Sequence, residues 1–399
     1  MIFLPLVALL LFVIGLVSLA LLGGGIYLAW AWFAGTLTGT LVLVSGIVML
    51  LLSLLGRPIV LFLFRRAGED EPKAARDGAA QVQQIRRPDG TVLHVEVYGP
   101  RDGQPIVFTH GWGPNSTEWY YAKRLLANRF RLIVWDLPGL GKSSRPVNND
   151  FSLEKMAADL GAVLSLAEGR PAILVGHSIG GMIQLTFCRL FPQHLGRSVA
   201  GIVELNTTYT QPLRTITARG FLQAIQKPVL EPLMHLMIWL FPVFWAMNWL
   251  SYFNGTAHIL TMFTGFAGTE SRGQLDYATL YTPMHSPAVL ARGVLAMFRF
   301  DETATLPAID VPVLVIAGDV DRATIPEAGA QMASRIPTAE LITLSPAGHM
   351  SNFERNAEVM QAIGSFSQRT GYAHALRNGL APDRTEVPGL RPGSPIPRL

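Results

Sequence analysis

The sequence predicts an α/β fold: a mostly parallel sheet flanked by helices, with a helical cap insertion and an N-terminal transmembrane hairpin. Short runs rich in Val, Ile and Leu alternate with segments of helical length, which is typical of parallel strands joined by crossover helices. About a hundred residues separate two of these runs where one helix would suffice, which favours a cap. The first 56 residues contain no Asp, Glu, Lys, Arg or His.

This uncharged segment predicts two membrane-spanning helices. Fifty-six helical residues would measure about 84 Å, whereas one crossing needs about 30 Å. We expect crossings near residues 4–30 and 41–64, joined by a turn at 35–39. A single long helix and a membrane-embedded oligomerisation hairpin are the alternatives, whereas a cleaved signal peptide would need a basic start and a short apolar core.

Basic residues lie near the end of the second expected crossing and after it, whereas the turn between the two crossings contains none. They are Arg57, Arg65, Arg66, Lys73 and Arg76. The positive-inside rule therefore predicts an integral protein of the inner or plasma membrane with its catalytic domain in the cytoplasm. Residues 65–83 are expected to form a solvated linker that also contacts anionic headgroups, an attraction weakened by its acidic residues.

The expected strands follow the linker in order. They are residues 93–98, 105–109, 131–135, 172–175, 199–205, 311–317 and 341–344, with a helix at 182–191. Together with the hairpin, they predict this organisation: transmembrane helices in 1–64, linker 65–83, first core part 84–206, cap 207–308, second core part 309–375 and disordered tail 376–399.

The sequence Gly176-His177-Ser178-Ile179-Gly180 lies where an expected strand passes into an expected helix. A serine nucleophile requires such a sharp turn, because its hydroxyl must project while the next amide faces the developing oxyanion. Ser178 is therefore the candidate nucleophile. His177 is a poor rival to the catalytic histidine, because its place beside Ser178 directs it away from the hydroxyl.

Candidates for an acid and a histidine follow the serine in the chain. Asp319 and Asp321 both come after an expected strand, and we favour Asp321, whose loop allows it to reach the histidine, while Asp319 caps the turn. The candidate histidine is His349, which follows a glycine at the end of the last strand. The order Ser, Asp, His is that of a serine hydrolase whose nucleophile lies on a strand-to-helix turn.

A second glycine-rich loop, His110-Gly111-Trp112-Gly113, follows an earlier strand. We expect the amides of Trp112 and Ile179 to form an oxyanion hole, in which each donor is typically worth roughly 3 kcal/mol. An ordinary glycine-rich strand exit is the alternative for this loop. Asp136, in a further loop, is expected to shape a turn.

Taken together, these motifs resemble those of the α/β-hydrolase superfamily over roughly residues 84–370. The motifs lie at 110–113, 136–143, 176–181, 318–321 and 348–349. The resemblance implies Ser178 as nucleophile, His349 as base and then acid, and Asp321 as the group that orients the imidazole. A serine at this position, where epoxide hydrolases and dehalogenases have an aspartate, implies acyl transfer and most simply ester hydrolysis.

The cap contains an apolar segment, residues 233–250, that is hydrophobic on nearly every face. A third crossing there would separate Ser178 from Asp321 and His349, so the segment is expected either to form the cap core or to act as a lid at the membrane interface. The chain resembles membrane-anchored esterases of the monoacylglycerol-lipase type, which implies a hydrophobic or lipid-like ester substrate. An acyltransferase with the same triad, or a non-catalytic scaffold, is the alternative.

Composition excludes several classes of function. The net charge of +4 is spread along the chain, so nucleic acid is not an expected partner. Cys188 is the single cysteine and can form no disulfide within the chain. No paired metal-ligand spacing and no phosphate-binding loop occurs, so we expect no metal and no cofactor.

Overall fold

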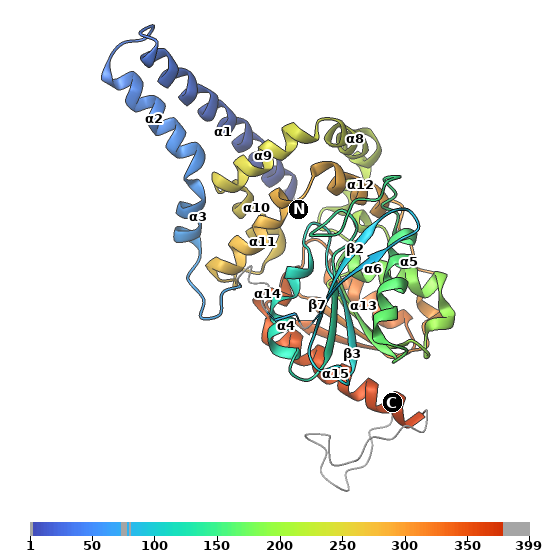
Figure 1. Cartoon of the computed structure of the whole chain (residues 1–399). Coiled ribbons are helices and arrows are strands. Elements are labelled where there is room, and N and C mark those ends of the chain that lie inside the picture. Colours follow the sequence, from blue (N-terminus) through green and yellow to red (C-terminus); the bar gives the residue numbers. More distant parts are fainter. Residues whose placement is uncertain (1–2, 73–77, 80, 378–399) are drawn as a thin grey trace.

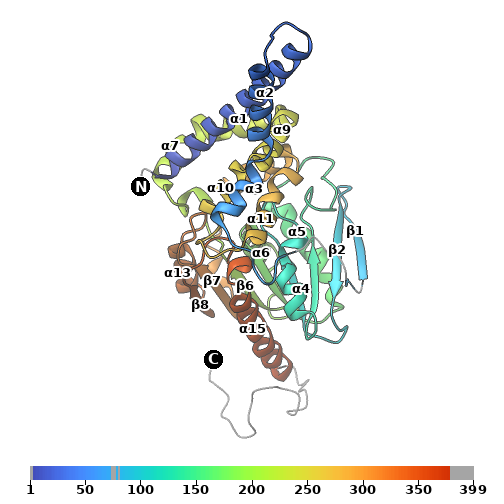
Figure 2. The ribbon, with the colours of Figure 1, turned by 90° about the vertical axis from the view of Figure 1, so that its left-hand side faces the viewer.

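The computed structural model describes residues 3–72, 78–79 and 81–377. A central sheet is covered by helices, a group of cap helices lies beyond one end of it, and a helical hairpin projects from the cap (Figure 1). Figure 2 shows this hairpin and the C-terminal helix at opposite ends of the molecule.

The described residues form one sheet of eight strands in the order β1-β2-β4-β3-β5-β6-β7-β8. β2 is antiparallel to both of its neighbours, and all the other pairs in this sheet are parallel, as predicted. The strands are β1 (Gln81–Arg86), β2 (Val92–Tyr98), β3 (Pro105–Thr109), β4 (Arg131–Trp135), β5 (Ala172–His177), β6 (Val199–Leu205), β7 (Val313–Gly318) and β8 (Ala339–Leu344). β1 lies partly in the expected linker and was not predicted, because this edge strand is mostly polar and exposed.

Helices bury both faces of the central strands, which explains why those strands are apolar without alternation. On β5, Leu174 belongs to the core beneath α5, α6 and α13, whereas Val175 belongs to the core beneath α4 and α15. These helices are α4 (Tyr120–Leu126), α5 (Leu153–Leu164), α6 (Ile179–Leu190), α13 (Pro326–Arg335) and α15 (Asn356–Arg377), and the short α14 (Ser351–Glu354) precedes the last. Of the expected tail, residues 376–399, all but the first two lie outside the described residues. Those two form the end of α15, which extends to Arg377.

The chain between β6 and β7 forms the cap. Its helices are α7 (Arg219–Ile225), α8 (Glu231–Trp239), α9 (Phe241–Phe253), α10 (Thr256–Gly265), α11 (Arg272–Met284) and α12 (Pro287–Met297). The apolar segment 233–250 is not one continuous helix, because α8 ends before Leu240 and α9 starts anew with Pro242 in its first turn. Proline has no amide hydrogen to continue α8, and the chain bends there by 98°.

The N-terminal segment forms α1 (Phe3–Phe33) and α2 (Thr40–Leu54), which pack side by side as a hairpin (Figure 1). The two helices approach closely at Gly25 and Gly46: a β-carbon at Gly25 would lie 2.9 Å from the Gly46 carbonyl oxygen. The expected second crossing at 41–64 is interrupted, because α3 (Gly56–Phe64) begins after a 55° bend. Pro58 has no amide hydrogen with which to continue α2, which accounts for this break.

In the described part of the chain, no single helix is both long enough and apolar enough to cross a membrane. The fully described part of α1, Leu19–Phe33, is a shorter apolar helix. Two bent pairs, α2 with α3 and residues 219–239 with α9, meet the requirements only when each pair is taken together.

Ion pairs bind α3 and the residues that follow it to the cap. Arg57 pairs with Asp276 of α11 at 2.5 Å, and Arg65 pairs with the buried carboxylate of Glu270 at 2.5 Å. The backbone amide of Arg272 also donates to the carbonyl oxygen of Arg66 at 2.7 Å. Arg65 and Glu71 of the linker therefore have side-chain partners in the cap, whereas residues 66–69 between them are exposed.

Candidate active site

Ser178 occupies a strained turn between β5 and α6. Its φ of 54° and ψ of −120° lie outside the regions that a residue with a β-carbon readily adopts. The flanking glycines are sterically required: a β-carbon at Gly176 would lie 2.5 Å from the Gly180 carbonyl carbon, and one at Gly180 would lie 2.3 Å from the Thr109 oxygen. The local structure is therefore the sharp strand-to-helix turn that the sequence predicts.

The structure brings His349 and Asp321 together. Asp321 Oδ2 lies 2.8 Å from His349 Nδ1, and the carboxylate is almost fully buried while the imidazole is 15% exposed. The amides of Ala323 and Thr324 and the Thr324 hydroxyl donate to the same carboxylate, at 2.8, 2.9 and 2.8 Å. With its carboxylate fixed in this way, Asp321 can hold His349 in the tautomer that carries a proton on Nδ1.

Asp319 makes different contacts. It accepts hydrogen bonds from the Ser345 hydroxyl at 2.6 Å and from the Ala347 amide at 2.9 Å. Both partners belong to the loop that leads to His349. Asp319 therefore shapes this loop, whereas Asp321 contacts the imidazole itself.

Asn206, at the end of β6, joins the acid loop to the histidine loop. Its Oδ1 accepts from the Gly318 amide at 2.9 Å, and its Nδ2 donates to the His349 carbonyl oxygen at 2.7 Å. Its backbone has a positive φ of 43°, a region in which asparagine is better tolerated than most residues. Sequence reasoning missed this residue, because a lone asparagine after a strand carries no recognisable motif.

The loop that contains Trp112 lies directly against the serine turn. A β-carbon at Gly111 would lie 3.0 Å from His177 Nδ1 and 3.5 Å from Ser178 Cβ. His110 accepts from the Leu137 amide through Nε2 and contacts the Gly111 carbonyl through Nδ1, so it is the Nδ1–H tautomer; burial lowers the pKa of His110. Ile179 is the first residue of α6, where backbone amides have no partner within the helix.

The Trp112 side chain joins this loop to the cap. Its indole Nε1 donates to the Leu290 carbonyl oxygen of α12 at 2.9 Å. The ring lies so close to the same helix that a β-carbon at Gly293 would be 2.1 Å from Cζ2. The sequence contains no signal for this contact, because the two segments are far apart in the chain.

Asp136 acts on backbone groups, as expected of a turn-shaping residue. Its carboxylate accepts from the Ser116 amide at 2.7 Å and from the Lys142 amide at 2.8 Å. Gly141, with φ +55°, must be a glycine, because a β-carbon there would lie 2.3 Å from this carboxylate. Asp136 therefore holds two loops at the same edge of the sheet.

Glu204 is a buried carboxyl group beneath the first turn of α6. Its side chain is fully buried, and neither of its oxygens has a hydrogen-bond partner among the described residues. A β-carbon at Gly181 would lie 2.1 Å from its Oε2, so the two elements touch. Burial raises the pKa of Glu204 well above its ordinary value of 4.5, which favours the uncharged carboxyl group.

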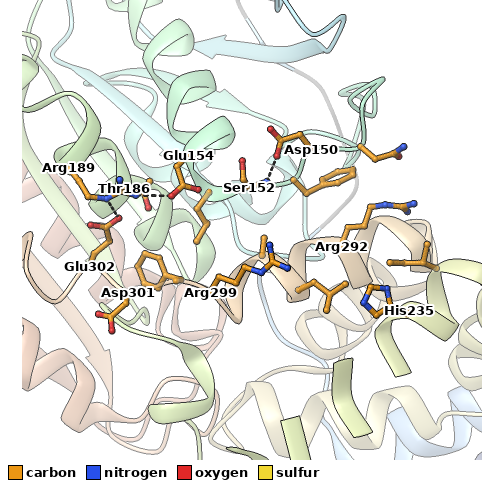
Figure 3. Close-up of a pocket in the computed structure, with 17 residues that line it drawn as sticks. Asp150, Ser152, Glu154, Thr186, Arg189, His235, Arg292, Arg299, Asp301 and Glu302 are labelled. Carbon is orange, nitrogen blue, oxygen red and sulfur yellow. Dashed lines mark hydrogen bonds and ion pairs between the residues drawn. The ribbon is translucent and has the colours of Figure 1, made fainter. Parts of the chain in front are cut away.

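A cavity of about 660 Å³ opens between the core and the cap (Figure 3). His235 of α8 and Arg292 of α12 line its cap side, and Arg189 of α6 lines its core side. Arg189 is neutralised by Glu302 at 2.7 Å and Glu154 at 2.8 Å. None of the three candidate catalytic residues lines this cavity, so it is separate from the serine turn.

No group of three or more His, Cys, Asp or Glu side chains among the described residues is arranged to hold a metal ion. The Cys188 thiol is buried on α6, which raises its pKa.

The sheet topology, the strained serine turn and the paired aspartate and histidine define a hydrolase-type α/β protein. The chain belongs to the alpha/beta hydrolase family, whose sequence profile matches residues 106–362. It is 26% identical over 272 residues to a putative carbamate hydrolase, RutD, of Pseudomonas syringae, covering 66% of this chain and 94% of that protein. It is also 28% identical over 305 residues to the dihydrolipoyllysine-residue acetyltransferase component of an acetoin cleaving system of Pseudomonas putida, covering 74% and 73%.

Among solved structures, an esterase from Exiguobacterium antarcticum superposes with a TM-score of 0.58 at 22% identity. The match covers 72% of this chain and 100% of the esterase. At this identity the likeness concerns the fold.

Proposed function

We propose that the protein is a membrane-anchored serine hydrolase that cleaves carboxylic esters of hydrophobic or lipid-like acyl groups through an acyl-enzyme intermediate. The observation that carries this proposal is the conjunction of a strained serine turn with a buried Asp321–His349 pair. Strain of this kind persists only where the surrounding structure enforces it, and it is concentrated at functional sites.

Each of the three residues has a definite role in this reaction. His349 carries its proton on Nδ1, facing Asp321, which leaves Nε2 free to take the proton of Ser178. Ser178 then attacks the ester carbonyl, and His349 returns the proton to the departing alcohol. Water deprotonated by His349 releases the acid from Ser178, and the carboxylate of Asp321 stabilises the imidazolium in both steps.

In this proposal, the backbone amides of Trp112 and Ile179 donate hydrogen bonds to the negatively charged oxygen of the tetrahedral intermediates. The start of α6 supports this assignment, because amides at a helix N-terminus favour an anion. The contact of the Gly111 loop with Ser178 brings the second donor segment to the same place. Removing one such donor typically costs about 10²–10³-fold in kcat.

Exposed apolar side chains support a bilayer as the partner and a lipid-like ester as the substrate. On the cap, Trp239 is 77% exposed at the bend between α8 and α9, and on α3 Phe62 is 72% exposed. A groove of about 830 Å³ beside α3 has a mainly apolar lining that includes Leu55 and Phe253. Patches of this kind mark interaction sites, and tryptophan suits the membrane interface.

We further propose that the α1–α2 hairpin anchors the protein in the inner or plasma membrane with the catalytic domain in the cytoplasm. The described part of the turn between the helices contains no basic residue, whereas Arg57, Arg65 and Arg66 follow α2. Positive charges flanking apolar segments favour the cytoplasmic side. The Leu37→Cys variant, which places a thiol in the turn, should then react with a membrane-impermeant maleimide added to intact cells, and absence of labelling would contradict this orientation.

The test of the activity is hydrolysis of p-nitrophenyl esters, from acetate to palmitate, by the detergent-purified protein. Ser178→Ala measured beside it gives the blank. Serine-dependent turnover with an optimum at medium or long acyl chains is expected for a lipid-like substrate. Turnover that is no higher than the blank at every chain length would refute ester cleavage.

Acyl transfer is the second candidate, favoured by the likeness to the acetyltransferase component of Pseudomonas putida. The same Ser178 would form the acyl-enzyme, but an alcohol or amine would accept the acyl group in place of water. Adding acceptor alcohols to the ester assay separates the two, because a transferase yields new ester in preference to free acid at low acceptor concentration. A non-catalytic scaffold would react with no fluorophosphonate probe at Ser178.

A further inference from the structure

A buried glutamate lies where three loops of the candidate active site meet. Glu118, on the short helix Ser116–Trp119, is fully buried, and its Oε2 accepts from the Gly111 amide at 2.7 Å. Its Oε1 lies 2.5 Å from His177 Nδ1 and accepts from Asn352 Nδ2 at 3.3 Å. One carboxylate therefore contacts the oxyanion loop, the serine turn and the segment after the catalytic histidine.

His177 extends this connection to the catalytic histidine itself. Its Nε2 lies 2.9 Å from the His349 carbonyl oxygen, which is an acceptor only, so Nε2 carries a proton. The two imidazole rings are 4.8 Å apart between centroids. The two ring nitrogens of His177 therefore face Glu118 and the His349 carbonyl oxygen, and Nε2 holds the backbone of His349.

The two side chains form an ion pair in the folded protein. Burial by itself lowers the pKa of His177, but the charge of Glu118 outweighs this effect and raises the pKa above its ordinary value. Burial likewise favours protonation of Glu118, but the charge of His177 outweighs it and lowers the pKa of Glu118. Removing either partner would leave an uncompensated charge in the interior, so the loss of one partner should disturb the loops that the pair joins.

We propose that Glu118 and His177 are positioning residues, which fix the oxyanion loop, the serine turn and the histidine loop in one geometry. This inference rests on the proposed ester-cleaving function. A displacement of about 1 Å among reacting groups typically costs about 10²-fold in rate. The pair touches no reacting atom, so its loss should lower kcat and leave KM nearly unchanged.

Glu118→Ala and Glu118→Gln separate the positioning role from the charge. In Glu118→Gln, the amide oxygen can still accept from Gly111, and the amide nitrogen can donate to a neutral His177 that keeps its proton on Nε2. We expect Glu118→Ala to lower kcat on p-nitrophenyl butyrate by about 100-fold, and Glu118→Gln to recover most of that loss. The matched control is Asp159→Asn, which disrupts a buried ion-pair cluster on α5 and should leave kcat unchanged.

Hydrogen–deuterium exchange of the detergent-purified full chain provides a readout that does not depend on activity. Glu118→Ala should accelerate exchange in two separate peptides, one covering residues 110–113 and one covering 345–352. Asp159→Asn should accelerate it in neither. If Glu118→Ala does not fold, Glu118→Asp, which withdraws the carboxylate by one methylene group, should show the same two changes.

The outcomes distinguish the inference from the function on which it rests. Wild-type kcat in Glu118→Ala, beside normal serine-dependent turnover of the parent, would overturn the positioning role alone. An equal loss of kcat in Glu118→Ala and Glu118→Gln would also overturn it, because the hydrogen bonds to Gly111 and His177 that Gln retains would then have no effect on turnover. An inactive parent would refute ester cleavage, and the exchange of the two peptides would still show whether the pair joins the loops.

Discussion

Gly293→Ala should lower turnover, because α12 touches the indole of Trp112 at this glycine. A β-carbon at position 293 would lie 2.1 Å from Cζ2 and 2.2 Å from Cε2 of that ring. Ordinary contact between carbon atoms is about 3.5 Å, so the ring or the helix must move by roughly 1.4 Å. An indole is rigid, and no rotation of its terminal atoms relieves the overlap.

The surroundings of Trp112 direct this displacement toward the active site. Its Nε1 is held by the Leu290 carbonyl oxygen at 2.9 Å, and its ring lies edge-on to Phe151 with 6.2 Å between centroids. A displaced ring therefore shifts the backbone that carries the proposed oxyanion donor. Since about 1 Å of misplacement costs about 10²-fold, we expect kcat to fall by about 100-fold in Gly293→Ala.

The assay is p-nitrophenyl butyrate turnover together with the thermal unfolding midpoint. Gly161→Ala, in α5, is the matched control. A β-carbon there would lie 3.4 Å from Phe187, an ordinary contact distance, and the substitution should stabilise the folded protein by roughly 0.5–1 kcal/mol. In a Trp112→Leu background, Gly293→Ala should have little further effect, since the overlapping ring is gone. Wild-type kcat with a lowered midpoint would mean that the cap moves instead, and would refute the coupling.

Three further predictions follow from other contacts. Asp321→Asn should lower kcat by about 10⁴-fold through the wrong imidazole tautomer, and an equal loss in Asp319→Asn would show that the acid has been misassigned. Removing residues 1–55 should leave activity on short soluble esters and lower it on vesicle lipid, whereas removing 1–64 also deletes α3 and its cap ion pair and should lower the unfolding midpoint. Glu204→Gln should be more stable than the parent at high pH but not at low pH, measured by urea unfolding between pH 4 and 9.

The sign of the Glu204 effect follows from proton linkage. The folded state retains a proton that the unfolded chain loses above its ordinary pKa of 4.5, so the folded protein binds more protons in that range. Stability is therefore complete below this pKa and falls as pH rises toward the raised pKa of the folded state. Glutamine cannot ionise and removes the slope, and parallel curves for the two proteins would contradict the raised pKa.

Several features of the fold and site were predictable because they depend on short-range patterns. The parallel sheet follows from apolar runs separated by helix-length segments, and the serine turn follows from two glycines at positions where a β-carbon would overlap the backbone. Asp321 and His349 were predicted from their order along the chain after Ser178, and Asp321 was favoured over its rival Asp319 because its loop allows it to reach the histidine. The structure places these two side chains in direct contact.

Features that depend on contacts between distant segments were not predictable. The second apolar stretch reads as one span in the sequence, yet α3 turns away after Leu55, and Arg57 meets Asp276 more than two hundred residues later. The Trp112 contact with α12 and the bonds from Glu118 to Gly111 likewise join separate segments. None of these pairs has a characteristic spacing.

By itself, the sequence determined the fold class, the strained serine turn and the order of the candidate catalytic residues, because steric limits and hydrophobic periodicity act between near neighbours. Only the tertiary structure decided that Asp321 rather than Asp319 contacts His349, that Glu118 lies where three loops meet, and that α3 belongs to the cap. Packing selects these contacts from many possible partners, since a buried charge or ring must find a complement in three dimensions wherever it lies in the chain.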